Sequence, residues 1–117
     1  MARAAPLVDE IANELDTWPG VRIEAHPDGT VLVHYEDLEL GTLDRDRAVV
    51  ELRFAPSEYR ELVEGGAAEP ADSMPASDLI EQRIEGPADV TAALELFDRR
   101  YRELRGEDDP YGSRGAD

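Results

Sequence analysis

Four short stretches between residues 21 and 54 alternate apolar and polar side chains, and short polar joints separate them. They read VRIEAH, TVLVHYE, LELGTL and AVVELRF, and the turn sequence PDG follows the first of them at residues 27–29. Alternation with a period of two gives each strand one apolar face, and a proline and a glycine so close together favour a tight turn. The pattern therefore predicts an antiparallel meander, with Val50, Leu52 and Phe54 of the last stretch facing inward.

Helical patterns flank this meander. Residues 6–18, PLVDEIANELDTW, repeat apolar side chains at helical spacing, and Pro19 and Gly20 end the predicted helix. Residues 56–66, PSEYRELVEGG, predict a short helix that ends in glycines. Residues 78–84, DLIEQRI, then predict one more strand.

A longer helix is predicted from Pro87 to Leu104, because apolar residues form a continuous stripe there. On its polar face the spacing pairs Glu95 with Arg99, and Asp98 with Arg102, four residues apart. The last residues, GEDDPYGSRGAD, contain no periodic pattern.

Together these patterns predict a two-layer α+β fold in the order α-ββββ-α-β-α. A mostly antiparallel sheet of four to five strands needs a cover on its apolar face, and the helices have the stripes to supply it. We expect a single domain over residues 1–105, followed by a flexible acidic C-terminal tail over residues 106–117.

The charge balance restricts the partners and the environment. There are 28 acidic residues against 12 basic ones, every basic residue is an arginine, and the formal net charge is -16. Such a surface repels phosphate backbones, so we expect no nucleic-acid partner. The acids occur in every segment rather than in one tail, which favours adaptation to molar salt over an acidic adaptor that docks on a basic partner.

Cysteine usage and hydropathy restrict the location and the chemistry. The chain has no cysteine, which excludes disulfides, thiol nucleophiles and thiolate metal sites. No apolar run approaches the ~20 residues of a membrane helix, and the first residues are too acidic for a signal peptide. We therefore expect a cytoplasmic protein with no membrane partner.

Residues 65–78 read GGAAEPADSMPASD, a composition typical of either a linker between domains or a loop within one. The strand predicted after this stretch is too short to form an independent unit with one helix. The stretch is therefore predicted to be an internal loop.

The sequence resembles the luciferase-domain family, a group of small bacterial and archaeal proteins similar to part of the fungal bioluminescence enzymes. The resemblance covers roughly residues 8–104. The motifs that carry it are WPGV at 18–21, ELG at 39–41, AEP at 68–70 followed by Pro75 and Ser77, and DVTAALELF at 89–97.

The resemblance implies a histidine site that this chain has lost. In that family a His-x-His typically follows ELG, and the loop after AEP carries further histidines and a Ser-Gly-Trp. Only His26 matches a histidine position of the family. The other positions read Thr42 and Asp44 after ELG, Ala71 and Asp72 in the loop, and Ser77, Asp78 and Leu79 in place of Ser-Gly-Trp.

Carboxylates near those positions are the weak candidates for a site. Asp44, Glu69 and Asp72 are suitable ligands for Mg²⁺ or Ca²⁺, and His26 for proton transfer. The alternative is that the three acids belong to a uniformly acidic surface, and that His26 and His34 are solvated residues at the ends of strands. No cofactor is strongly implied, since no phosphate loop, metalloprotease helix or dinucleotide fingerprint occurs.

We therefore expect a non-catalytic or degenerate luciferase-domain-like protein of a salt-adapted cytoplasm. It is predicted to bind a small ligand or a protein partner in a groove between the third strand and the 65–78 loop. The alternative is a small hydrolase or isomerase that uses Asp44 or Asp72 as a base, with or without a divalent metal.

Overall fold

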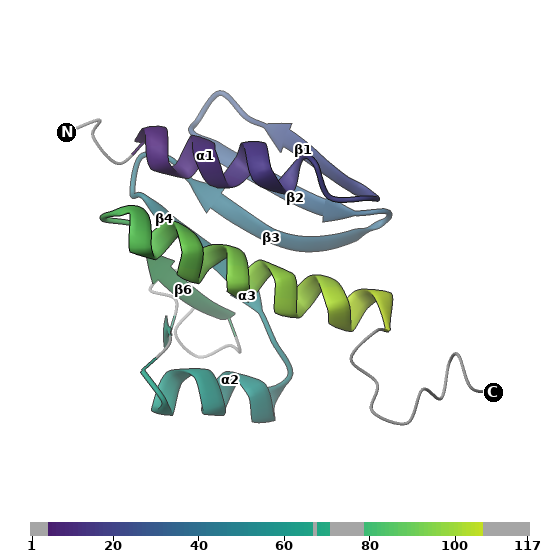
Figure 1. Ribbon diagram of the computed structural model, residues 1–117, viewed down its shortest axis with the longest axis vertical. Helices are drawn as coiled ribbons and strands as arrows, with labels where there is room; N and C mark the ends of the chain where they lie inside the picture. Colours follow the sequence, from purple (N-terminus) through teal and green to yellow (C-terminus); the bar gives the residue numbers. More distant parts are fainter. Residues whose placement is uncertain (1–4, 67, 71–78, 107–117) are drawn as a thin grey trace.

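The computed structural model describes residues 5–66, 68–70 and 79–106, which contain three helices and six strands (Figure 1). The predicted α+β class and the predicted order of the elements are confirmed. The elements are α1 (Ala5–Leu15), β1 (Val21–Ala25), β2 (Thr30–Tyr35), β3 (Leu38–Asp44), β4 (Val49–Arg53), α2 (Pro56–Glu64), β5 (Glu69–Pro70), β6 (Leu79–Arg83) and α3 (Pro87–Arg105).

The strands form one antiparallel sheet in the order β1-β2-β3-β4-β6-β5. The first four pair with their neighbours in the chain, as the alternating pattern predicts. One strand, β5, was not predicted, because it lies in the stretch that was predicted to be a loop. It pairs with β6, with Glu69 opposite Glu81 and Pro70 opposite Ile80. Two residues carry no recognisable period, so the sequence predicted four to five strands rather than six.

Helices cover one face of the sheet. α1 and α3 lie side by side across it, and α2 packs beside β5 and β6 (Figure 1). The side chains of Val50, Leu52 and Phe54 are buried under this layer, which confirms the predicted phase of β4. Burial of large apolar side chains such as Phe97, at about 25 cal/mol per Å², is the main contribution to stability.

Tyr101, near the end of α3, contacts residues from the first third of the chain. Its hydroxyl donates a hydrogen bond to the Pro19 carbonyl at 2.7 Å. Its ring lies 5.0 Å from that of Trp18 and 5.3 Å from that of Tyr35, measured between centroids. The end of α3 is thereby fixed against the connection between α1 and β1.

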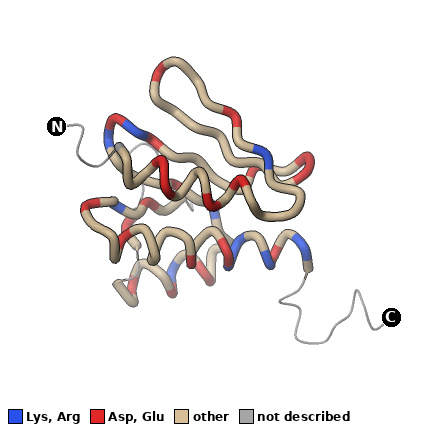
Figure 2. The backbone as a smooth tube through the Cα atoms, turned by 45° about the horizontal axis from the view of Figure 1, so that its top comes forward, with Lys and Arg blue, Asp and Glu red and all other residues tan. Residues whose placement is uncertain are grey.

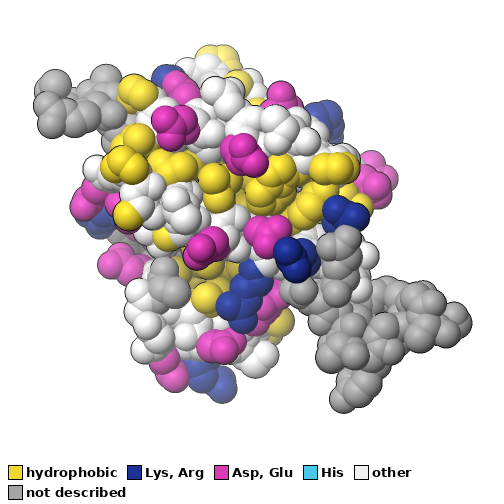
Figure 3. Space-filling model, viewed as in Figure 1, with side chains coloured by type: hydrophobic (Ala, Val, Ile, Leu, Met, Phe, Trp, Pro, Cys, Tyr) yellow, Lys and Arg dark blue, Asp and Glu magenta, His cyan; other side chains and the backbone are white. Residues whose placement is uncertain are grey.

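The other face of the sheet carries polar and charged side chains, such as those of Arg22, Thr42, Glu51 and Arg53. Among the described elements no helix covers this face, which we call the open face (Figure 1). Acidic residues are spread over the described helices, strands and turns rather than gathered in one region (Figure 2). On the helix face, an apolar band follows the seam between α1 and α3 (Figure 3).

None of the described helices is long and apolar enough to cross a membrane. α3 ends at Arg105, and Gly106 follows it as a C-cap with a left-handed φ of 82°. The predicted tail lies outside the described residues from position 107 onward.

Candidate ligand-binding site

β3 and β4 separate partway along their length. They pair at only three positions, Thr42 with Glu51, Leu43 with Val50 and Asp44 with Val49. On the other side of β3 the register with β2 shifts between Val33 and His34, which leaves Leu40 as an extra residue. Such a bulge bends a strand, and here it directs the first half of β3 away from β4.

Gly41 stands at the point of separation, and the space there leaves no room for a side chain. A Cβ atom at this position would lie 2.8 Å from the Glu51 carbonyl oxygen and 2.8 Å from Cε1 of Phe97. It would also lie 3.1 Å from Cγ of Leu52. Glycine therefore lets β3 approach both β4 and α3 closely before the strands separate.

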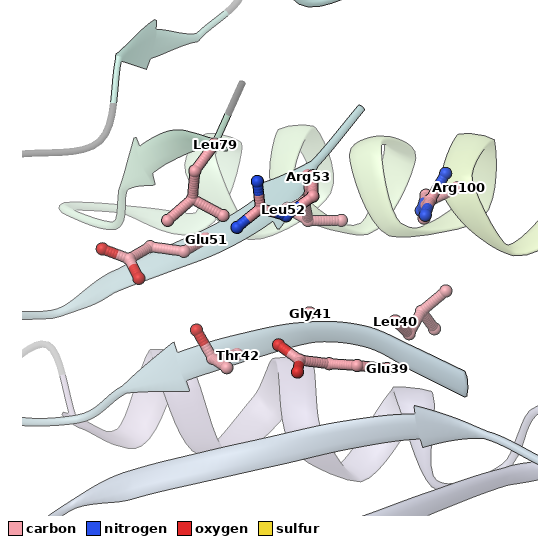
Figure 4. Close-up of a pocket in the computed structure, with 9 residues that line it drawn as sticks. All are labelled: Glu39, Leu40, Gly41, Thr42, Glu51, Leu52, Arg53, Leu79 and Arg100. Atoms are coloured by element: carbon pink, nitrogen blue, oxygen red, sulfur yellow. The ribbon is translucent and has the colours of Figure 1, made fainter. Parts of the chain in front are cut away.

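A pocket of about 310 Å³ occupies the wedge between the two strands (Figure 4). Strands β3, β4 and β6 and helix α3 all contribute to its wall. The side chains that border it include those of Glu39 and Thr42 from β3, Glu51 and Arg53 from β4, Leu79 from β6 and Arg100 from α3.

Groups of both charges border this pocket. Arg53 and Arg100 supply guanidinium groups, and Glu39 and Glu51 supply carboxylates (Figure 4). Arg100 also donates through Nη1 to Oε1 of Glu103 at 3.3 Å. The arrangement is suited to a small molecule that carries an anionic group together with hydrogen-bond donors.

A pair of carboxyl groups lies behind Arg100, between α2 and α3. Burial raises the pKa of Glu103, and the hydrogen bond to Glu58 and the charge of Glu58 raise it further, to about 7. Burial also raises the pKa of Glu58, but hydrogen bonds from Glu103 and Arg99 outweigh this effect and lower it below its ordinary value. The two groups therefore hold one proton between them near neutral pH.

Arg99 contacts Glu58 of this pair, and its partners differ from the one predicted from the sequence. Its Nε donates to Oε2 of Glu58 at 2.6 Å, and its Nη2 donates to Oε1 of Glu61 at 3.0 Å. It thus contacts α2 rather than Glu95, because two carboxylates across the helix interface are better placed than one on the same helix. The second predicted pair, Asp98 with Arg102, is confirmed at 2.9 Å.

Two of the three carboxylates predicted as metal ligands, Asp44 and Glu69, lie far apart. Asp44 accepts the N–H of Arg47 at 3.0 Å, so it stabilises the turn between β3 and β4. Glu69 lies three strands away on β5, roughly 14 Å across the sheet at the usual strand spacing. Asp72 lies outside the described residues, as do Ser77 and Asp78, which stand where the family has Ser-Gly.

Glu69 instead stands beside two other carboxylates, which the sequence reasoning missed. It is opposite Glu81, which is opposite Glu51 on the next strand. Arg47 contacts both of the latter, with Nη2 at 3.3 Å from Glu81 and Nη1 at 3.6 Å from Glu51. The Glu81 side chain is only 2% exposed, so the pairing with Arg47 offsets part of the cost of its burial.

Both histidines lie against one carboxylate on the open face. Nε2 of His26 lies 3.1 Å from Oε2 of Glu24, and Nε2 of His34 lies 3.3 Å from Oε1 of the same residue. The alternation of β1 and β2 predicts that these three side chains share a face, but not that they touch. Across the ranges that the structure describes, no three His, Asp or Glu side chains are arranged to hold a metal ion.

Comparisons with known proteins give no relative. No family model matches the chain, and neither a curated protein nor a solved structure is significantly similar to it.

Proposed function

We propose that this chain is a non-catalytic domain that binds a small polar molecule in the pocket between β3 and β4. The observation that carries the proposal is the pocket itself, whose volume of about 310 Å³ lies at the lower end of the range for small-molecule sites. That volume equals the space of about ten liquid water molecules. The ligand is therefore a small metabolite rather than a nucleotide or a flavin.

The charges around the pocket narrow the class of ligand. A guanidinium group recognises a carboxylate through paired hydrogen bonds, and Arg53 and Arg100 border the pocket from two different elements. Glu39 and Glu51 accept hydrogen bonds from an ammonium or a hydroxyl group. An amino acid or a hydroxy acid satisfies both sets of groups.

The resemblance to the luciferase-domain family supports the same location. Its ELG motif is residues 39–41, and all three border the pocket. The next residue, where that family typically has a histidine, is Thr42, which also borders it. We therefore propose a divergent, degenerate member of this family, in which the site has kept its shape and lost its imidazoles. Asp44 does not border the pocket, so the geometry supports binding better than catalysis by that carboxylate.

We further propose that the protein functions in a salt-adapted cytoplasm. The support is compositional: 28 acids against 12 arginines, no lysine, and acidic residues spread over the chain (Figure 2). Molar salt screens the repulsion that a net charge of -16 produces at low ionic strength.

Thermal unfolding in molar KCl tests the binding proposal. The protein is screened with amino acids, hydroxy acids, flavins and divalent cations, each alone. A ligand present at about 100 times its Kd adds about 2.7 kcal/mol of stability, which raises Tm by about 10 °C for a domain of this size. We expect such a shift from an amino or hydroxy acid.

A matched pair of variants locates the site. Arg53→Gln removes a guanidinium group that borders the pocket, and Arg60→Gln removes an exposed one on α2. We expect the Tm shift to disappear in Arg53→Gln and to remain in Arg60→Gln. A shift that only divalent cations produce, and that Asp44→Ala abolishes, supports the alternative carboxylate enzyme. No shift with any compound counts against a small-ligand site.

A further inference from the structure

β1 is an edge strand of the sheet. It pairs with β2 on one side only, and no other described strand lies along its opposite side (Figure 1). An edge of this kind presents backbone N–H and C=O groups that are ready to pair with another strand.

The hydrogen bonds of the β1–β2 hairpin show which backbone groups face outward. Directly opposed residues in an antiparallel pair alternate between hydrogen-bonded and non-hydrogen-bonded pairs. The N–H of His26 donates to the Thr30 carbonyl at 2.8 Å, and the N–H of Glu36 donates to the Gly20 carbonyl at 2.9 Å. The even-numbered residues of β1 between these two bonds therefore also direct their backbone groups toward β2.

The odd-numbered residues Val21, Ile23 and Ala25 direct their N–H and C=O groups the other way. The N–H of Val21 donates to the Trp18 carbonyl at 3.1 Å, outside the sheet, in agreement with this assignment. In the described part of the chain, no hydrogen bond reaches the outward groups of Ile23 or Ala25. The helix-facing side chains of Val21 and Ile23 are only partly buried.

β1 is complementary to itself in charge. Its open-face side chains are Arg22 and Glu24, placed symmetrically on either side of Ile23. If a second copy pairs antiparallel with Ile23 opposite Ile23, each Arg22 stands opposite Glu24 of the other copy. These are non-hydrogen-bonded pairs, in which Cβ atoms are about 4.5–5.5 Å apart and opposite charges attract.

The same register also matches the backbone groups. Ile23 of each copy exchanges N–H···O=C bonds with its counterpart, and the N–H of each Ala25 meets the carbonyl of Val21. A shift of two residues in either direction places Arg22 opposite Arg22 or Glu24 opposite Glu24, which is repulsive. A shift of one residue places the outward-facing backbone N–H and C=O groups of one copy opposite backbone groups of the other copy that are already hydrogen-bonded to β2.

We propose that two copies of this chain associate through their β1 edges, antiparallel and centred on Ile23, to form one continuous sheet. Six strands in each copy give a sheet of twelve. Within one copy Glu24 already contacts Arg22 at 3.6 Å, as well as both histidines. The side chains of Arg22 and Glu24 are 63% and 44% exposed, so both remain accessible to the second copy.

Charge reversal tests this register. Arg22→Glu places two like-charged pairs at the dimer axis, and so does Glu24→Arg. Sedimentation velocity measures the dimer dissociation constant of the full chain between micromolar and millimolar concentration. The buffer contains molar KCl, which screens the charge of -16 on each copy. We expect each variant to weaken the dimer roughly tenfold or more.

Mixing the two variants distinguishes an interface from a folding defect. In a mixed dimer every Arg22 or Glu24 position again faces the opposite charge, so we expect equimolar mixing to restore association. Arg60→Glu and Glu64→Arg make the same changes in net charge on exposed positions of α2, and we expect both to dimerise like the wild type.

Three results would overturn the proposal: a wild-type chain that stays monomeric at millimolar concentration, reversal variants that behave like the α2 controls, or a mixture that does not associate. None of them bears on the binding proposal, because β1 contributes no residue to the pocket between β3 and β4.

Discussion

Replacing Glu103 with glutamine removes one ionisable group from the carboxyl pair between α2 and α3. The side chains of Glu58 and Glu103 are 19% and 23% exposed, and the two share a hydrogen bond. Burial, followed by the bond to Glu58 and its charge, raises the pKa of Glu103 from 4.5 to about 7. At pH 8 the native state therefore holds a carboxylate that its surroundings disfavour.

The sign of the effect follows from the direction of the shift. A carboxyl group whose pKa is raised by folding stabilises the native state below its unfolded pKa, and this stabilisation is lost as the pH rises through the folded pKa. A rise in pKa from 4.5 to about 7 corresponds to at most about 3 kcal/mol. Solvent screening at this partly exposed site reduces the effect, and we expect about 1–2 kcal/mol.

Urea unfolding at constant KCl concentration and a series of pH values measures the effect. We expect Glu103→Gln to come closest to the wild type at pH 5 and below, and to exceed its free energy of unfolding by about 1–2 kcal/mol at pH 8. The lowered pKa of Glu58 acts below about pH 4.5, so it does not contribute to this difference. Glu61→Gln, on a side chain that is 69% exposed, is the control. Equal pH dependence in Glu103→Gln and wild type would falsify the shared-proton interpretation.

Three further predictions concern stability. Gly41→Ala places a Cβ atom against the Glu51 carbonyl and Phe97, so we expect the free energy of unfolding, measured in urea, to fall by about 1–3 kcal/mol. An unchanged free energy of unfolding contradicts the close approach of the strands at Gly41. Tyr101→Phe removes the bond to the Pro19 carbonyl, and we expect a loss of about 1 kcal/mol in the same assay, whereas no loss means that the bond contributes nothing. Finally, the free energy of unfolding is expected to rise between low and molar KCl, and a fall with salt argues against salt adaptation.

The fold was largely predictable because the sheet is amphipathic. Each strand of the meander has one buried face, so the period of two locates both the strand and its orientation, as Val50, Leu52 and Phe54 illustrate. Strand β5 was missed because two residues paired by backbone hydrogen bonds leave no trace in side-chain pattern. Its position depends on β6, which supplies the edge to which it adds.

The pocket was predictable only in part. It lies beside the third strand and includes Thr42, which the sequence analysis named, but its opposite wall is β4, whereas the expected groove was bounded by the 65–78 stretch, of which no described residue borders the pocket. The wedge itself depends on the bulge at Leu40, and a bulge changes the register between strands without changing the alternation within either. Arg100 was missed because its role depends on how α3 crosses the sheet.

The carboxyl pair was missed for a related reason. Glu58 and Glu103 lie on different helices, and nothing in either local sequence marks them apart from the other acids. Local spacing predicted the contact between Asp98 and Arg102, which depends only on helix geometry. It failed for Arg99, whose partners on α2 are set by tertiary packing.

The contacts of Tyr101 also bear on how the chain folds during synthesis. This residue is near the end of the last helix, yet it bonds to Pro19 and packs on Trp18 and Tyr35, which the ribosome makes much earlier. A nascent chain that stops before Pro87 has its strands but lacks the helix that covers the centre of their apolar face. The domain therefore completes its fold only after α3 has left the exit tunnel, and fragments that lack α3 expose the sheet to aggregation.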